Sequence, residues 1–128
     1  MLVRMKRKNS RYPDLTPHHD YVVIGIEADD FRILNDRGQP YLYPARLFAM
    51  VDAREPKDWI KERGNDNEHY AYPLALNRVG FFEDFFEQKQ DAVATFWQVV
   101  NQRLAANRTL RRKSAVPSRM KIDSRLAA

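Results

Sequence analysis

Runs of alternating apolar and polar residues predict short strands near the start of the chain. Residues 21–27 (Tyr-Val-Val-Ile-Gly-Ile-Glu) are rich in β-branched side chains and predict the clearest strand. A tight turn separates them from residues 31–34, which predict the return strand. Because side chains alternate along a strand, Phe31 and Ile33 share one face and Arg32 lies on the other.

One phrase, Tyr-x-Tyr-Pro-x-x-Leu, occurs twice, at residues 41–47 and 70–76. Each copy follows a polar turn, at residues 36–39 and 64–67. Proline cannot donate a hydrogen bond to a strand ladder, so each copy predicts a strand that ends at its proline. A one-turn connector follows, and its leucine returns to the core. The repeat is therefore interpreted as scaffold.

The remaining apolar segments extend this meander. Residues 48–51 predict a fourth short strand, and residues 59–62 with 69–72 predict a second hairpin. Gly25 lies inside the first strand, where glycine is typical of a bulge or a sharp bend. The body is thus expected to contain about five or six short strands.

The periodicity changes to a helical one after residue 80. Residues 81–86 place pairs of aromatic side chains around two acids, and Asp91 is a plausible helix N-cap. Apolar residues then recur at helical spacing, which predicts an amphipathic helix packed on the sheet: Val93, Phe96, Trp97, Val100 and Leu104. Pro117 predicts a break, so a frayed or irregular tail is expected from about residue 107.

The strand-forming run resembles the SH3-like small barrels of short bacterial proteins. Four segments carry the resemblance: Tyr21–Glu27, Phe31–Leu34, Tyr41–Pro44 and Leu47–Phe48. It covers roughly residues 16–86. It implies a small SH3-like barrel, to which the predicted C-terminal helix is added, and, because some such proteins are immunity proteins or antitoxins, a protein-binding role. It carries no catalytic residues across.

Charge divides the chain into three parts. Residues 1–13 carry five basic groups and no acid, residues 14–102 have a net charge of −7, and residues 103–128 have a net charge of +7. We therefore expect a basic N-terminal arm (1–13), a folded acidic body (14–106) and a basic tail (107–128). With no cysteine, no apolar run of bilayer length and no signal-peptide pattern, a soluble cytoplasmic protein is expected.

The acidic body favours a basic protein partner, such as a toxin that the chain blocks by steric and electrostatic means. Acids on or beside the hairpin turns, together with one tyrosine, predict a single acidic, aromatic-edged rim: Glu27, Asp29, Asp30, Asp36, Asp66, Glu68 and Tyr70. The alternative explanation is turn chemistry alone, since aspartate favours turns.

The sequence also allows a second function, namely nonspecific binding of nucleic-acid phosphates through the basic ends. The tail residues that would serve it are Arg108, Arg111, Arg112, Lys113, Arg119 and Lys121. No aromatic residue is interleaved with them, so base stacking is not predicted.

The histidines offer weaker candidates. His18 and His19 with Asp20 could bind a metal, and Glu68 with His69 could form an acid–base pair. The possible metal site lacks a further ligand, and the possible acid–base pair lacks a second general acid. We therefore interpret these histidines as ordinary surface residues. We expect no metal, no cofactor and no catalysis.

Overall fold

Strand β2 (Asp20–Glu27) is the central strand of the sheet and pairs with three other strands. The computed structural model describes residues 1–123, with side chains through residue 106. The first half of β2 pairs with β1 (Leu2–Met5), and its second half pairs with β3 (Asp30–Leu34) and with β7 (His69–Pro73), all antiparallel. The second half of β2 is therefore flanked on both sides.

The register of β2 against β3 shifts between Val23 and Gly25. This irregularity lies where the glycine predicted one, so the predicted bulge is confirmed.

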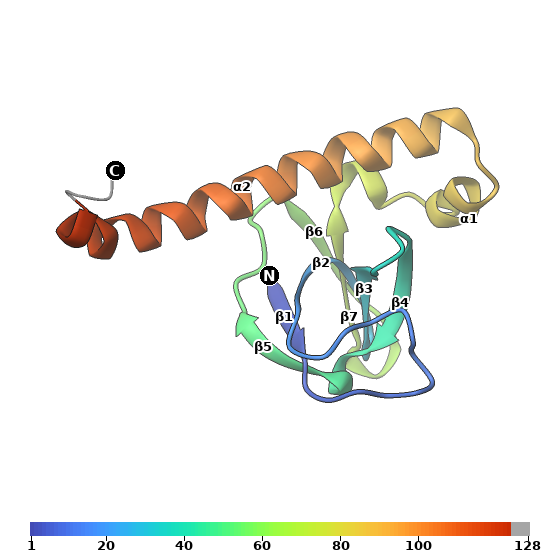
Figure 1. Cartoon of the computed structure of the whole chain (residues 1–128). Coiled ribbons are helices and arrows are strands. Elements are labelled where there is room, and N and C mark those ends of the chain that lie inside the picture. The colour runs from blue at the N-terminus through green and yellow to red at the C-terminus, as the bar shows by residue number, and fades with distance from the viewer. Residues whose placement is uncertain (124–128) are drawn as a thin grey trace.

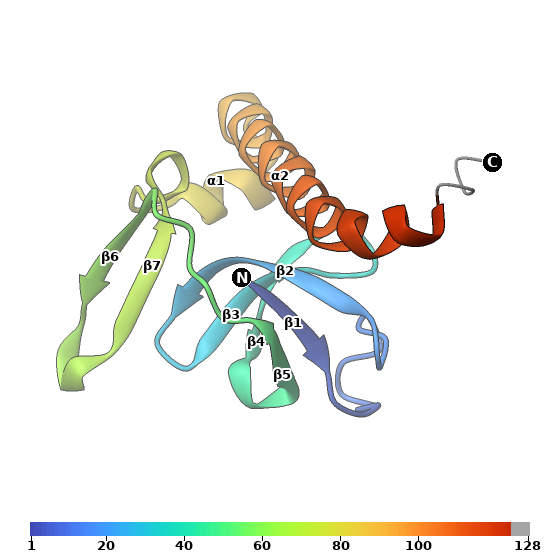
Figure 2. The same ribbon diagram turned by 90° about the vertical axis from the view of Figure 1, so that its left-hand side faces the viewer.

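The sheet has the strand order β4-β3-β2-β1-β5, in which β4 spans Pro40–Pro44 and β5 spans Phe48–Asp52. A hairpin of β6 (Trp59–Arg63) and β7 joins it through β2, and Figure 2 shows this hairpin standing apart from β1 and β5. Within residues 1–123 no ladder joins β4 to β5. The fold is mainly β with a C-terminal helix, as predicted, but the sheet is open and the expected closed barrel is not observed.

Both copies of the repeated phrase adopt the predicted local structure. Strand β4 ends at its proline and continues into the one-turn 3-10 helix η1 (Ala45–Leu47). Strand β7 ends in the same way and continues into η3 (Leu74–Leu76). Leu76 is buried and Leu47 packs against the core at partial burial, so both leucines return to apolar contacts.

The prediction that residues 1–13 form a basic arm outside the folded body is wrong for their first part, because residues 2–5 are a strand of the sheet. Met1, Leu2, Val3 and Met5 are buried, whereas Arg4 points outward and its Nε lies 2.7 Å from a carboxylate oxygen of Asp20. Apolar residues at the terminus supply a middle strand of the sheet. The basic residues that follow them obscured this short pattern.

Apolar side chains form two separate cores, one on each face of β2. The first lies within the curved sheet and contains Val3, Met5, Leu15, Tyr21, Val23, Ile33, Tyr43, Phe48 and Trp59. The second lies between the sheet and the helices and contains Ile24, Tyr72, Leu76, Phe81, Phe85, Ala92, Phe96 and Val100. Burial on both faces explains the nearly continuous apolar sequence of β2.

Helices α1 (Phe81–Phe86) and α2 (Gln90–Asp123) cover the second core, and α2 runs across one end of the strands (Figure 1). The predicted apolar stripe is confirmed, because Phe96 and Val100 are buried and its other members pack against them. Helix α2 begins one residue before Asp91 and runs past Pro117, where a break was expected. Proline removes one backbone donor from a helix and bends it, which does not by itself end the helix.

Candidate functional site

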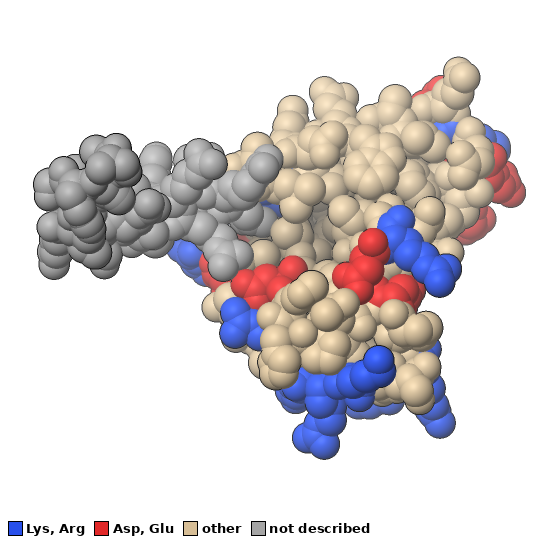
Figure 3. Space-filling view, in the orientation of Figure 1, with Lys and Arg blue, Asp and Glu red and all other residues tan. Residues whose placement is uncertain are grey.

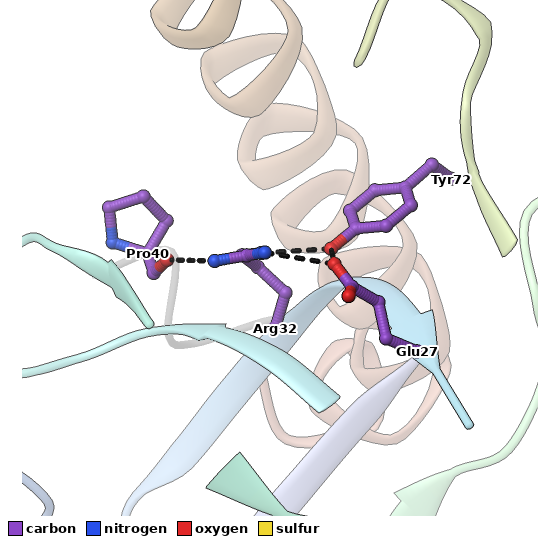
Figure 4. Close-up of polar contacts among 4 residues, drawn as sticks. All are labelled: Glu27, Arg32, Pro40 and Tyr72. Carbon is purple, nitrogen blue, oxygen red and sulfur yellow. Dashed lines mark hydrogen bonds and ion pairs between the residues drawn. The ribbon is translucent and has the colours of Figure 1, made fainter. Parts of the chain in front are cut away.

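A buried arginine lies between the sheet and α1. Alternation along β3 places Arg32 on the face opposite Ile33, and its side chain is 9% exposed. Its guanidinium donates hydrogen bonds from Nε to the Tyr72 hydroxyl at 2.8 Å, from Nη1 to the Pro40 carbonyl at 2.9 Å and from Nη2 to Glu27 Oε2 at 2.9 Å (Figure 4). The ring of Phe82 covers the guanidinium at 3.9 Å. The charge is therefore compensated on every side, as a buried cation requires.

Tyr72 completes this network by donating its own hydroxyl to Glu27 Oε2 at 2.5 Å. Burial, together with the neighbouring Glu27 carboxylate, raises the pKa of Tyr72 well above its ordinary value. The ring lies directly against Gly25, where a Cβ atom would come within 2.1 Å of it. The position of Tyr72 thus depends on a glycine in the neighbouring strand.

Above this network is a hollow of about 560 Å³, which we call the aromatic groove. Its lining comes from β2, β3, the β6–β7 hairpin and the segment from η3 into α1: Glu27, Arg32, Glu62, Tyr70, Tyr72, Leu76, Asn77, Arg78, Val79, Gly80, Phe81, Phe82, Glu83 and Phe86. Two apolar side chains at its edge face solvent, since Val79 is 99% exposed and Phe86 is 38% exposed. Phe86 also stacks on Tyr41 with ring centroids 5.3 Å apart.

The uncompensated charge of the groove is negative. Arg32 is neutralised by Glu27, and Arg78 pairs with Asp84 at 2.9 Å. Among the described side chains, no cation pairs with the other two acids of the lining, Glu62 and Glu83. A cation that entered the groove would therefore meet carboxylates that have no internal partner.

The segment at the mouth of the groove is fixed by an ion-pair cluster. Asp84 lies between Arg78 and Lys89, whose Nζ is 3.1 Å from its carboxylate. The hydrogen bonds from Lys89 and Arg78 hold the pKa of Asp84 below its usual value. Gly80 precedes α1 with φ of 80°, a left-handed conformation that favours glycine. Both features define the path of the chain into α1.

Six of the seven residues predicted for the acidic rim lie at one end of the sheet. Glu27 and Tyr70 line the groove, and the Tyr70 hydroxyl donates to Glu68 Oε1 at 3.0 Å. The β2–β3 turn lies beside the start of β7, where the Ala28 N–H donates to the His69 carbonyl at 2.9 Å. That turn carries two further acids and the β6–β7 turn carries one: Asp29, Asp30 and Asp66.

Asp36 is the exception, and its assignment to this rim is corrected. It lies at the opposite end of β3, where its carboxylate accepts hydrogen bonds from Thr16 Oγ1 and the Tyr21 hydroxyl, both at 2.6 Å. Consecutive hairpin turns fall at opposite ends of antiparallel strands, so Asp36 cannot share an edge with the β2–β3 turn. Its carboxylate fastens the β1–β2 loop to the sheet.

The histidine candidates gain no support from the geometry. Nε2 of His69 lies 3.2 Å from each carboxylate oxygen of Glu55, whereas Glu68 contacts Tyr70. Within the described residues, no group of three or more histidine, cysteine or acidic side chains could hold a metal ion. The predicted tail residues from Arg108 onward lie outside the described side chains.

Several residues of the groove were not singled out from sequence, namely Arg32, Glu62 and Glu83. The sequence did contain a signal for Arg32. An arginine between two apolar strand residues must either reach solvent or find buried partners. The exposed position of Phe86 agrees with the crowding of four phenylalanines on a six-residue helix.

Comparison with known proteins adds no identification, since no family model, curated protein or solved structure matches the chain. Among the described residues, none of the helices combines the length and the apolar character that a bilayer crossing requires.

Proposed function

We propose that this protein is a noncatalytic binding module that holds a positively charged segment of a partner protein in the aromatic groove. The observation that carries the proposal concerns Glu62 and Glu83, which have no cationic partner among the described side chains. They line the same groove as the exposed apolar side chains Val79 and Phe86. This combination matches a lysine or arginine side chain, which has an apolar stem and a charged head.

Two physical terms favour such an occupant. A cation near an aromatic face gains roughly 0.5–2 kcal/mol, depending on how far it is desolvated. Complementary charge also speeds encounter, and the acids of the β2–β3 and β6–β7 turns extend the negative surface beyond the groove itself. The acidic rim therefore attracts the cationic segment of the partner, and the groove holds the segment once it is bound.

The titratable groups nearest the groove floor support binding over catalysis. Glu27 and Tyr72 are both engaged with Arg32 at hydrogen-bond distance. The raised pKa of Tyr72 keeps it protonated at neutral pH. Tyr72 is therefore not poised to exchange a proton with a substrate near pH 7, which a general acid or base requires.

We further infer that the fold is an SH3-like variant and that the role is that of an immunity protein or antitoxin in the cytoplasm. The pairing of β1 with both β2 and β5, and the one-turn η1 between β4 and β5, support the SH3-like assignment. A toxin that acts on nucleic acid carries a basic surface, and an acidic inhibitor competes for it.

The test is affinity capture from the native cell with the full-length chain, after nuclease treatment. We compare Glu62→Gln/Glu83→Gln with the matched control Glu87→Gln/Asp91→Asn, whose residues lie outside the groove lining. Both variants lose two negative charges. Each variant also changes one acid in the first turn of a helix, Glu83 in α1 or Asp91 in α2.

The expected result is one basic protein that the native chain and the control capture and the groove variant loses. Equal capture by both variants, or capture of acidic proteins only, would overturn the proposal.

A further inference from the structure

A second charged surface lies on the loop between β1 and β2. Figure 3 shows lysine and arginine side chains gathered at the lower end of the molecule, where Figure 1 places this loop. Four exposed basic residues of the loop and one of η1 form what we call the basic loop surface: Lys6, Arg7, Lys8, Arg11 and Arg46. None of the five has an ion pair among the described side chains.

The loop is held in place by its own core contacts. Leu15 is 4% exposed within the first core, and the ring of Tyr12 packs edge-on against Tyr43 at 5.7 Å. The Lys6 N–H donates to the Leu47 carbonyl at 3.1 Å, which fixes the start of the loop beside η1. The basic side chains thus project from an ordered backbone, so less conformational entropy is lost when they bind.

Between the loop and η1 is a hollow of about 270 Å³ lined by Lys6, Arg7, Asn9, Arg46 and Leu47. Three of the five lining residues are cations, one is an amide and none is an acid. Bare cations around a hollow without a carboxylate favour an anion, and arginine forks match the geometry of phosphate oxygens.

We propose that the basic loop surface binds the phosphodiester backbone of nucleic acid without reading its sequence. The surface has five cations on one ordered face, and successive phosphates offer a row of charges that several cations can meet together. The acids of the β2–β3 turn, Asp29 and Asp30, line a neighbouring hollow that shares Arg46 with this one, and they mark the edge of the surface. This site is separate from the aromatic groove.

The absence of exposed aromatic side chains from the basic loop surface indicates whether it prefers duplex or single-stranded nucleic acid. No exposed aromatic side chain belongs to it, since Tyr12 is half-buried against Tyr43. Single-strand binding proteins gain much of their affinity from bases stacked on aromatic rings. Duplex is therefore bound at least as tightly as single strand.

The experiment measures fluorescence anisotropy of a labelled duplex of about 20 base pairs, titrated with the full-length chain at about 50 and 200 mM salt. The loop variant replaces Lys6, Arg7, Lys8 and Arg11 by glutamine. The control replaces four exposed cations elsewhere by glutamine: Arg37, Lys57, Lys61 and Arg63. Both variants have the same net charge, and their urea midpoints verify that each is folded.

We expect the loop variant to bind at least tenfold more weakly at low salt, with the slope of log K against log salt smaller by about three to four, because each phosphate contact contributes about 0.9. The control should stay within about threefold of the native chain. An equal loss in the control would show that net charge alone is responsible and would overturn the proposal.

Three further results would overturn it. One is tighter binding of the single-stranded oligonucleotide than of the duplex. Another is loss of binding only when Arg108, Arg111, Arg112 and Lys113 are changed to glutamine. The third is binding to phosphatidylglycerol vesicles with no binding to duplex.

Discussion

Replacing the buried arginine tests the network beneath the aromatic groove. Arg32→Met keeps most of the side-chain volume but removes three hydrogen-bond donations and the contact of the cation with the Phe82 ring. It leaves the Glu27 carboxylate next to a buried tyrosine with no cation. Removing one partner of a buried pair costs about 3–5 kcal/mol when the other charge stays buried.

The expected magnitude is somewhat lower, because the Glu27 side chain is 33% exposed and regains some hydration. We expect a loss of about 2–4 kcal/mol in the free energy of unfolding, from the cost of an orphaned charge discounted for that exposure. With a urea m-value of about 1.5 kcal/mol/M, the unfolding midpoint should fall by about 2 M. Arg32→Lys should also destabilise, because an ammonium cannot reproduce the three-way fork.

Equilibrium urea unfolding followed by circular dichroism measures the effect, with the exposed Arg37→Met as control. Adding Glu27→Gln to Arg32→Met should restore about 1 kcal/mol or more, since the second change removes the stranded charge. A loss below about 0.5 kcal/mol, or an equal loss in the control, would refute the assignment of Arg32 as the centre of a buried network.

The remaining predictions concern packing and pH. Gly25→Ala should cost about 3 kcal/mol in unfolding free energy, because its methyl group would overlap the tyrosine ring of the buried network. Gly38→Ala, with φ of 74° but open space around it, should cost only about 1 kcal/mol, and equal costs in urea unfolding would contradict this reasoning. Because Lys89 and Arg78 lower the pKa of Asp84, its contribution is present above the unfolded value of 3.8 and is lost as the pH falls below it. The urea midpoint of Asp84→Asn should therefore decline less than that of the native chain between pH 5 and pH 2, and parallel declines would argue against the cluster.

Much of the local structure could be predicted from sequence because it depends on neighbouring residues. β-branched side chains favour extended backbone, and proline stops each repeated strand, so six of the seven strands in the described residues and both connectors were located correctly. The apolar stripe beginning at Val93 predicted α2 for the same reason. Strand β1 escaped detection because its short apolar run is followed directly by the basic residues from Lys6 onward.

The candidate site depends on contacts between distant residues, which local patterns do not reveal. Strand alternation predicted which face of the sheet carries Arg32. It could not predict the hydrogen-bond partner Tyr72, which is 40 residues further along the chain. The openness of the sheet likewise depends on whether β4 and β5 meet. Asp36 could have been excluded in advance, because successive turns of a meander alternate between the two ends of the sheet.

The most direct test of the central proposal is a titration of the isotope-labelled full-length chain with a synthetic peptide, followed by two-dimensional NMR. The peptide has about ten residues in which lysine or arginine alternates with leucine, so that it offers both stem and charge. A matched peptide with glutamate in place of the cations is the control.

We predict saturable shifts of the amides of Glu62, Tyr70, Val79 and Phe86 with the basic peptide only. Glu62→Gln/Glu83→Gln should weaken its binding by roughly tenfold, which corresponds to about 0.7 kcal/mol for each carboxylate lost. Shifts spread evenly over all exposed acids, or equal shifts with the glutamate peptide, would contradict a groove built for a cationic partner.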